Sequence, residues 1–569
     1  MATDRRNYNV FFNTHTVSGI VISVGLFVCF FAGAFALFLN EINYWEANAK
    51  REGYQTEVDY DRLLTIADEE GYNLEGRTLF MSYREGTKSY LQVSGQVKPA
   101  DSSQVSEDTQ EAAPVSKEDS LANSAFFLMI DPESYEVRAT EFDRSTKELG
   151  TFLYHLHYFE QIPAVGIYLA GLVALFFAFA IFTGIIVHWK KIVSNFFTFR
   201  LKGSVKNLWT DAHTALGVIG LPFQLMYAVT GAFFGLIILL YIPFLTILYD
   251  GDQEKMFEIF RPAASNMEVP PVADVDEVSI NTLVSSAIAE FDPSELDFVS
   301  VQVKDYQEEN AELVVNTTLD SKEKFMASSI TTFRLSDGAK IGYKPIDENK
   351  YVDVAPALIG KLHFARFGGY LLKAVYFVLA LITCFVIMSG VMIWLTARDK
   401  KMYAHKAKFN QNVGAIYLGA CMGLFPSIAL FFCMVKLFPL EMANRYDIMP
   451  GIFFGFWLAY IIYSYFIKST YKINQHALYL AGVMGLLIPG LNGLQSGLWF
   501  WKSFQMGYLD SFFIDTSWLV MGVTSILCAF YAKPVVDVRK ARKAAASKKK
   551  AEPIGVETKI PQLVPNAQE

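Results

Sequence analysis

The chain has 569 residues, of which 52% are hydrophobic and 15% aromatic, and its formal net charge is -8. Several uninterrupted apolar stretches are long enough to cross a bilayer as an α-helix, which takes roughly 18 residues or more. The composition therefore excludes a soluble globular protein, and the acidic balance gives no indication of a nucleic-acid partner.

The fold class predicted from these stretches is a mainly α-helical polytopic membrane protein that spans the lipid bilayer with eight helices. The predicted spans are residues 17–40, 163–188, 214–247, 367–396, 413–437, 449–467, 476–499 and 513–531. The first apolar run is too long for a secretory signal peptide and lacks a small-residue cleavage pattern. We therefore expect the first span to stay in the membrane.

Lysine and arginine in the short connections predict the orientation of the chain. Basic residues precede span one, follow spans two and four, lie between spans six and seven, and follow span eight. All these segments fall on one side, so both termini are predicted to be cytoplasmic, with the protein in the inner membrane of a bacterium. The polar segments 41–155 and 248–362 then lie outside, in a periplasm.

Each outer segment predicts a small α+β domain, with one helix on an antiparallel sheet. The expected helices are 58–71 and 277–291, and the expected strands are 77–83, 89–97, 124–130, 296–304, 311–318 and 326–335. A polar tract at 99–121 predicts a flexible insertion in the first domain. The other predicted regions are the N-terminus with span one (1–40), spans two and three with their loop (156–247), span four (363–398), four additional spans (411–531) and a basic, disordered cytoplasmic tail (532–569).

An internal duplication places four of the eight histidines. Two of them follow a leucine and precede a glycine at the same distance along the chain: His157 precedes Gly184, and His363 precedes Gly390. The other two are followed by a threonine and share a second, shorter spacing to a glycine: His15 precedes Gly33, and His213 precedes Gly231. The repeated spacings indicate two equivalent structural units.

Each repeat unit consists of one outgoing span, one outer domain and one returning span. Such a parallel repeat predicts an approximate two-fold axis along the membrane normal. The axis pairs His15 with His213 near the cytoplasmic surface, and His157 with His363 near the outer surface. Opposed histidines enclosed by apolar helices are the arrangement that ligates haem iron from both faces, so we predict two bis-histidine b-type haems.

The repeated glycines and one arginine complete the predicted cofactor sites. Gly33 and Gly231 lie roughly 27 Å along their helices from His15 and His213, at the depth of the outer pair. Gly184 and Gly390 lie roughly 40 Å from His157 and His363, at the cytoplasmic end. These glycines could let helices approach a flat macrocycle, or they could serve helix packing alone. Arg366 could contact haem propionates or an anionic chelate, or it could extend to the membrane surface.

The remaining histidines are weaker candidates. His155 could replace His157 as a ligand, but its counterpart in the other repeat is Lys361, so the symmetry favours His157. His188, His405 and His476 have no partner in the repeat and are expected at the interface or in solvent.

Five motifs carry a resemblance to a known family. They are His15-Thr-Val-Ser-Gly19, Leu156-His157, Asp211-Ala-His213 with Thr230-Gly231, Leu362-His363-Phe-Ala-Arg-Phe-Gly-Gly369 and Gly390-Val-Met-Ile-Trp394. Over about residues 8–398 the chain resembles the PepSY-associated transmembrane helix proteins. The resemblance implies PepSY modules outside the membrane and the chemistry of di-haem reductases that release iron from ferric siderophores, often with TonB-dependent uptake components. The family core has four spans, so the role of 411–531 is left open.

The predicted function is transmembrane electron transfer. An electron would enter near His15 and His213 from a quinol or cytoplasmic donor and leave near His157 and His363 to ferric iron in a periplasmic siderophore or chelate. One alternative is a non-redox PepSY scaffold that regulates a periplasmic partner, although a scaffold does not require four histidines in register. The other is a permease, which predicts broken helices and buried charges at mid-membrane.

Overall fold

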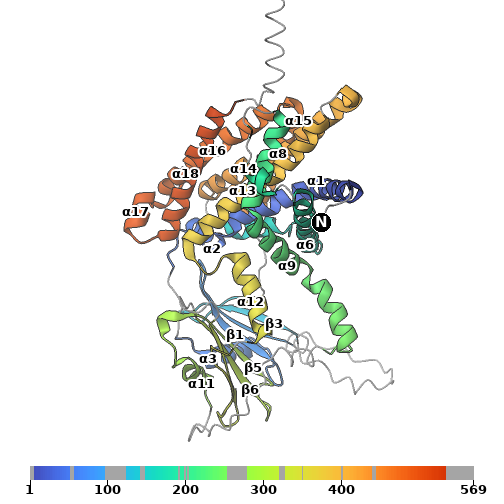
Figure 1. Cartoon of the computed structure of the whole chain (residues 1–569). Coiled ribbons are helices and arrows are strands. Elements are labelled where there is room, and N and C mark those ends of the chain that lie inside the picture. The colour runs from blue at the N-terminus through green and yellow to red at the C-terminus, as the bar shows by residue number, and fades with distance from the viewer. Residues whose placement is uncertain are drawn as a thin grey trace, which may run out of the picture.

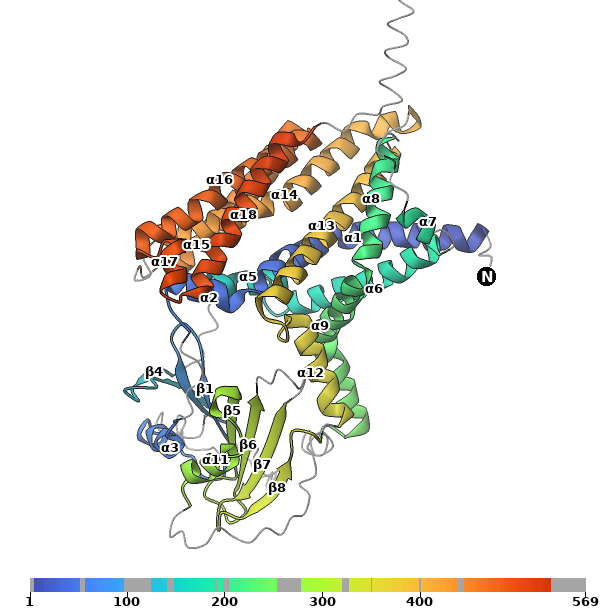
Figure 2. The same ribbon diagram turned by 60° about the vertical axis from the view of Figure 1, so that its left-hand side comes forward.

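The computed structural model describes residues 5–51, 57–96, 124–140, 148–189, 192–197, 200, 204–252, 278–319, 327–348, 350–398, 401–438, 442 and 444–533. The predicted insertion 99–121 and all but the first residues of the predicted tail 532–569 lie outside these ranges. A bundle of long helices carries one β-sheet domain at one end (Figures 1 and 2). We call the end of the bundle next to the sheet the sheet side and the opposite end the distal side.

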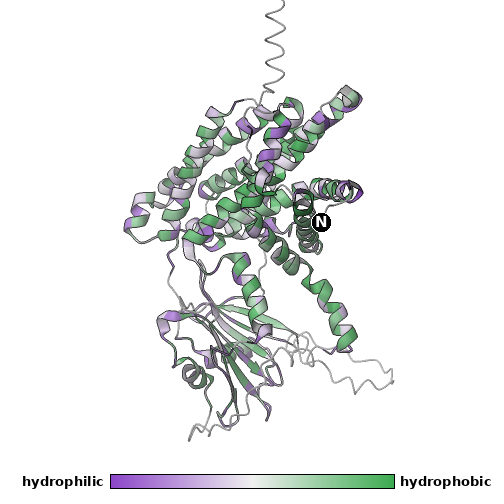
Figure 3. Cartoon of the chain, in the orientation of Figure 1, coloured by the Kyte–Doolittle hydropathy of each residue, from purple (hydrophilic) through white to green (hydrophobic). Residues whose placement is uncertain are grey.

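Within the residues that the structure describes, eight helices are long and apolar enough to cross a membrane, as predicted. They are α1 (Arg5–Ala36), α6 (Gly166–His188), α9 (Leu221–Leu248), α13 (Gly369–Arg398), α14 (Ala407–Leu437), α15 (Arg445–Ile467), α16 (Thr470–Ser496) and α18 (Leu509–Tyr531). Helices satisfy all their backbone hydrogen bonds internally, which a bilayer requires. Figure 3 shows that hydrophobic residues dominate these helices, whereas many hydrophilic residues lie on the sheet domain.

Shorter helices join the spans. They are α2 (Leu39–Ala47), α5 (Leu149–His157), α7 (Ile192–Phe196), α8 (Val205–Ile219), α12 (Tyr351–Phe364) and α17 (Phe500–Gln505). The predicted third span, 214–247, is interrupted in the structure, because α8 ends and α9 begins at Gly220. Pro222 stands in the first turn of α9, where a proline has no hydrogen bond to lose.

The first four spans show the predicted duplication. One unit contains α1, α5 and α6, and the other contains α8, α9, α12 and α13. Helix α1 packs against α13 of the other unit, and α9 packs against α6 in the equivalent way. The last four spans form a second group in which α14 contacts α15 and α16, and α16 contacts α18. Helix α14 joins the two groups through contacts with α1 and α13.

The two outer domains share one eight-stranded antiparallel sheet, whereas the sequence predicted a small sheet in each. Its order is β4-β3-β2-β1-β5-β6-β7-β8. The strands are β1 (Leu79–Arg84), β2 (Tyr90–Gly95), β3 (Phe126–Ile130), β4 (Val137–Ala139), β5 (Leu296–Lys304), β6 (Glu312–Leu319), β7 (Ser328–Arg334) and β8 (Lys340–Lys344). Equivalent strands β1 and β5 pair at the centre, with Leu79 opposite Val303. Antiparallel pairing of equivalent strands is what a two-fold axis through the sheet produces.

Two helices cover the same sheet, α3 (Tyr60–Glu69) and α11 (Ile280–Ile288), and they cap each other. The Asp61 carboxylate accepts hydrogen bonds from the backbone N–H groups of Ile280 and Asn281, at 2.9 and 3.2 Å. In return, the Asn281 side-chain oxygen accepts one from the Tyr60 N–H at 2.6 Å. A single apolar core contains residues from both halves, so the two PepSY-like modules form one body.

Candidate histidine sites in the helix bundle

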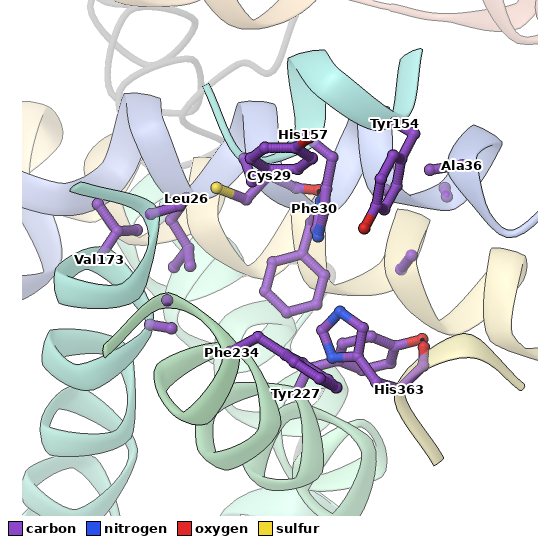
Figure 4. Close-up of a pocket in the computed structure, with 18 of the residues that line it drawn as sticks. Leu26, Cys29, Phe30, Ala36, Tyr154, His157, Val173, Tyr227, Phe234 and His363 are labelled. Atoms are coloured by element: carbon purple, nitrogen blue, oxygen red, sulfur yellow. Dashed lines mark hydrogen bonds between the residues drawn. The ribbon is translucent and has the colours of Figure 1, made fainter. Parts of the chain in front are cut away.

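The first histidine pair lies on the sheet side of the bundle. His157 is the last residue of α5 and His363 is near the end of α12, and their ring centroids are 6.0 Å apart. Both imidazoles reach a cavity of about 330 Å³ from opposite sides (Figure 4). The cavity is lined mainly by apolar and aromatic side chains, including Phe30, Tyr227 and Phe234. We call these two histidines the sheet-side pair.

The second pair lies toward the distal side. His15 belongs to α1 and His213 to α8, and their ring centroids are 6.3 Å apart with an interplanar angle of 74°. We call these residues the distal pair. The structure thus brings together the same two pairs that the repeat predicted from the sequence.

In each of three histidines, the Nδ1 atom lies against a backbone carbonyl of a neighbouring helix. The acceptors are the carbonyls of Ala180 for His15 at 2.8 Å, Cys29 for His157 at 2.6 Å and Val386 for His213 at 2.9 Å. A carbonyl can only accept a hydrogen bond, so Nδ1 carries the hydrogen. The lone pair of Nε2 is then available to a metal ion.

His363 is held by side chains instead. Its Nδ1 lies 2.8 Å from the Thr230 hydroxyl, which donates its own hydrogen to the Met226 carbonyl and so accepts from the imidazole. The Tyr227 hydroxyl donates to the His363 carbonyl at 2.8 Å. From the sequence, Thr230 was only part of a motif and Tyr227 was not predicted to contact the site. A hydroxyl on an apolar helix does not by itself indicate its partner.

Three of the repeated glycines make room for a histidine, and one of them, Gly33, also lines the sheet-side cavity. A Cβ atom on Gly33 would lie 2.6 Å from Nδ1 of His157. Each of these glycines lies one helical turn beyond the accepting carbonyl. The carbonyl and glycine pairs are Cys29 with Gly33, Ala180 with Gly184, and Val386 with Gly390. Gly231 differs, because a Cβ there would meet only Ala174 of α6, at 3.2 Å, and both residues line the sheet-side cavity.

Burial keeps the sheet-side histidines neutral. It lowers the pKa of His157, and it lowers the pKa of His363 to about 3, with a further contribution from His157. A neutral imidazole is the form that ligates metals. Neither residue would therefore have to lose a proton at physiological pH if it were to ligate a metal ion.

The distances between the paired rings fit one metal ion between each pair. A bond from a metal to an imidazole nitrogen is roughly 2 Å, so two imidazoles on opposite sides of one ion have ring centres about 6 Å apart. The centroid separations of 6.0 and 6.3 Å agree with this arrangement. The apolar lining of the sheet-side cavity also suits a flat organic cofactor.

Other candidates from the sequence lie outside the two pairs. His155 contacts the rings of Tyr154 and Tyr158, whereas the ring that pairs with His363 is that of His157. The Arg366 guanidinium lies over the Phe364 ring, 4.9 Å from its centroid. His188, at the end of α6, is close enough to His15 to interact with it electrostatically, which the repeat pattern did not indicate because His188 has no repeat partner.

The chain is similar to a known protein and to a protein family. Over 282 residues the chain is 22% identical to "Uncharacterized protein PA4219" of Pseudomonas aeruginosa, a match that covers 48% of this chain and 69% of that protein. The family described as "PepSY-associated TM region" matches residues 12–397, which include all four paired histidines and exclude the last four spans. This chain therefore belongs to the PepSY-associated TM family.

Proposed function

We propose that the protein carries electrons across the bacterial inner membrane through two b-type haems, each ligated by one histidine pair. The observation that carries the proposal is the hydrogen bonding of the four histidines. Every Nδ1 is held by an acceptor on another helix, and the rings of each pair stand about 6 Å apart. Helix packing alone requires neither that separation nor a fixed tautomer in all four residues.

The two sites lie at different depths in the bundle. The Cys29 carbonyl, which holds His157, and His15 of the distal pair both belong to α1. Their positions in the sequence put them roughly 21 Å apart along the helix, a large part of a hydrocarbon core about 30 Å thick. A haem held by two histidines supplies a one-electron carrier with no open position for a substrate. The proposal thus has two such carriers in series.

The direction of transfer follows from the predicted orientation. The basic loops place the distal side at the cytoplasm, where a quinol or a cytoplasmic protein would supply electrons, and the sheet domain in the periplasm. Tyr154, Tyr158 and Glu160 belong to the lining of the sheet-side cavity. An acceptor would be reduced there, beneath the sheet. Ferric iron in a siderophore or another chelate is the proposed acceptor, because hard oxygen ligands hold the reduced ion less tightly.

The test is a dithionite-reduced minus oxidised absorption spectrum of the purified protein after expression with sufficient haem. We expect a sharp low-spin b-type signal that corresponds to about two haems per chain, one for each bis-histidine site. His363→Ala should remove about half of this signal, because one ligand of the sheet-side pair is lost. His155→Ala is the matched control and should keep the whole signal. A wild-type protein without the b-type signal would favour the scaffold or permease alternatives.

A further inference from the structure

Each helix of the second group contributes a buried polar side chain around one short segment of α2. Lys436 of α14 donates to the Trp45 carbonyl at 2.7 Å. Arg445 of α15 forms an ion pair with Glu46 at 2.9 Å, and these side chains are only 0% and 2% exposed. Asp515 of α18 accepts a hydrogen bond from the Trp45 indole N–H at 2.8 Å and another from Asn492 of α16 at 2.9 Å.

The same segment of α2 holds the beginning of α5. The first N–H groups of a helix have no partner within the helix. Glu46 accepts a hydrogen bond from the Leu149 N–H at 2.6 Å, and Asn43 accepts one from the Gly150 N–H at 2.8 Å. Gly150 is so close to α2 that a Cβ atom would lie 2.3 Å from the Leu39 carbonyl oxygen. Helix α5 is thus fixed at its first turn by α2, and it ends at His157.

The other repeat unit is arranged differently. There, α9 continues as one helix to Leu248, and Tyr227 and Thr230 of that helix hold His363 directly. Within the described part of the chain, His157 alone among the paired histidines is connected to the second group of spans through this chain of buried contacts. The residues of the second group that contact α2 all follow residue 397, where the family match ends.

We propose that Glu46 and Arg445 are positioning residues for the sheet-side site, and that the last four spans serve to hold them. The inference rests on the proposed function. Glu46 caps the first N–H of α5, and His157 ends the same helix, about 12 Å further along its axis. A protein interior screens charge weakly. The Glu46 carboxylate and the Arg445 guanidinium would therefore interact electrostatically with an iron held by His157.

The test is a redox titration of the haem signal in the full-length protein at mildly alkaline pH. A His213→Ala background isolates the sheet-side site, and a His363→Ala background isolates the distal site. Glu46→Gln keeps an oxygen for the Leu149 N–H and removes the negative charge. Loss of a negative charge near the iron favours the reduced form over the oxidised form. We therefore expect the sheet-side midpoint potential to rise and the distal one to stay unchanged.

The double variant Glu46→Gln/Arg445→Met separates charge from packing. It removes both charges, so the sheet-side potential should return toward the wild-type value. Arg51→Gln is the matched control, because Arg51 pairs with Glu41 and Asp510 at the same end of the bundle rather than with a residue that caps α5. An unchanged sheet-side potential in Glu46→Gln, an equal shift at both sites, or an equal shift in the control would overturn the inference.

A second measurement does not require haem. Arg445→Met should speed hydrogen–deuterium exchange of the α5 amides in haem-free protein, with α12 unaffected, because α5 is the helix that Glu46 caps. Unchanged exchange in α5 would contradict the positioning role even if wild-type protein binds two haems. Faster exchange with no haem in the wild-type protein would instead refute the proposed function and leave the contact between α5 and the last four spans in place.

Discussion

At the scale of single residues, the position of three of the paired histidines depends on glycines, which have no side chain. Gly33, Gly184 and Gly390 each leave the surface of a helix bare one turn beyond an accepting carbonyl. An imidazole from another helix can then lie flat enough to donate its Nδ1 hydrogen to that carbonyl. The hydrogen bond fixes both the tautomer and the orientation of the ring, which is how outer partners tune metal ligands.

Substituting Gly33 tests this role. In Gly33→Ala the new Cβ would lie 2.6 Å from Nδ1 of His157, which is closer than side-chain contacts allow. The ring must move away from the Cys29 carbonyl, so the haem content should fall from about two to about one per chain. Gly19→Ala on the same helix is the control, because a Cβ there meets nothing within 4 Å. Full haem content in both variants would contradict the role given to Gly33.

At the scale of elements, the sequence patterns predicted the positions of helices and strands better than they predicted which strands pair. The predicted strand 296–304 coincides with β5, since its alternating burial is a local pattern. The strands β4 and β8 were not predicted, because strands of three and five residues are too short to show a clear alternation of apolar and polar residues. The joined sheet could not be predicted, because Leu79 and Val303 pair although they lie far apart in the sequence. Likewise, the histidine spacing predicted the pairs, whereas the carbonyls that hold them could come from any residue type.

The reciprocal caps of α3 and α11 should decide how firmly the two halves of the sheet domain hold together. Asp61→Ala removes the acceptor for the Ile280 and Asn281 N–H groups. We expect the opening free energy of the first turn of α11 to fall by about 2 kcal/mol, measured by hydrogen–deuterium exchange. Asp68→Ala, an exposed position on the same α3, is the control and should change it by less than about 0.5 kcal/mol. Equal protection of α11 in both variants would show that the cap does not join the halves.

At the scale of the whole molecule, two groups of spans differ in what they bury. The first group encloses the histidine pairs in apolar and aromatic surroundings. The second buries charges, as a permease would, but two of its cations are held by α2 at the sheet side, Arg445 by Glu46 at 2.9 Å and Lys436 by the Trp45 carbonyl at 2.7 Å. Breaking a buried ion pair is strongly destabilising, so such charges stay fixed on their partners, whereas a transport pathway needs groups that can face a passing solute.

Two histidine pairs in series predict how the whole protein responds when either pair is broken. In proteoliposomes with menadiol as electron donor and an external, membrane-impermeant ferric chelate, wild-type protein should reduce the chelate. His15→Ala and His157→Ala should each lower the rate of chelate reduction to that of protein-free liposomes, although each variant keeps one haem. The two sites lie roughly 21 Å apart, so the remaining haem cannot take the place of the lost one. His155→Ala should reduce the chelate at close to the wild-type rate. A His15→Ala protein that is as active as wild type would place the distal pair outside the electron path, and donor electrons would then have to enter directly at the sheet-side pair.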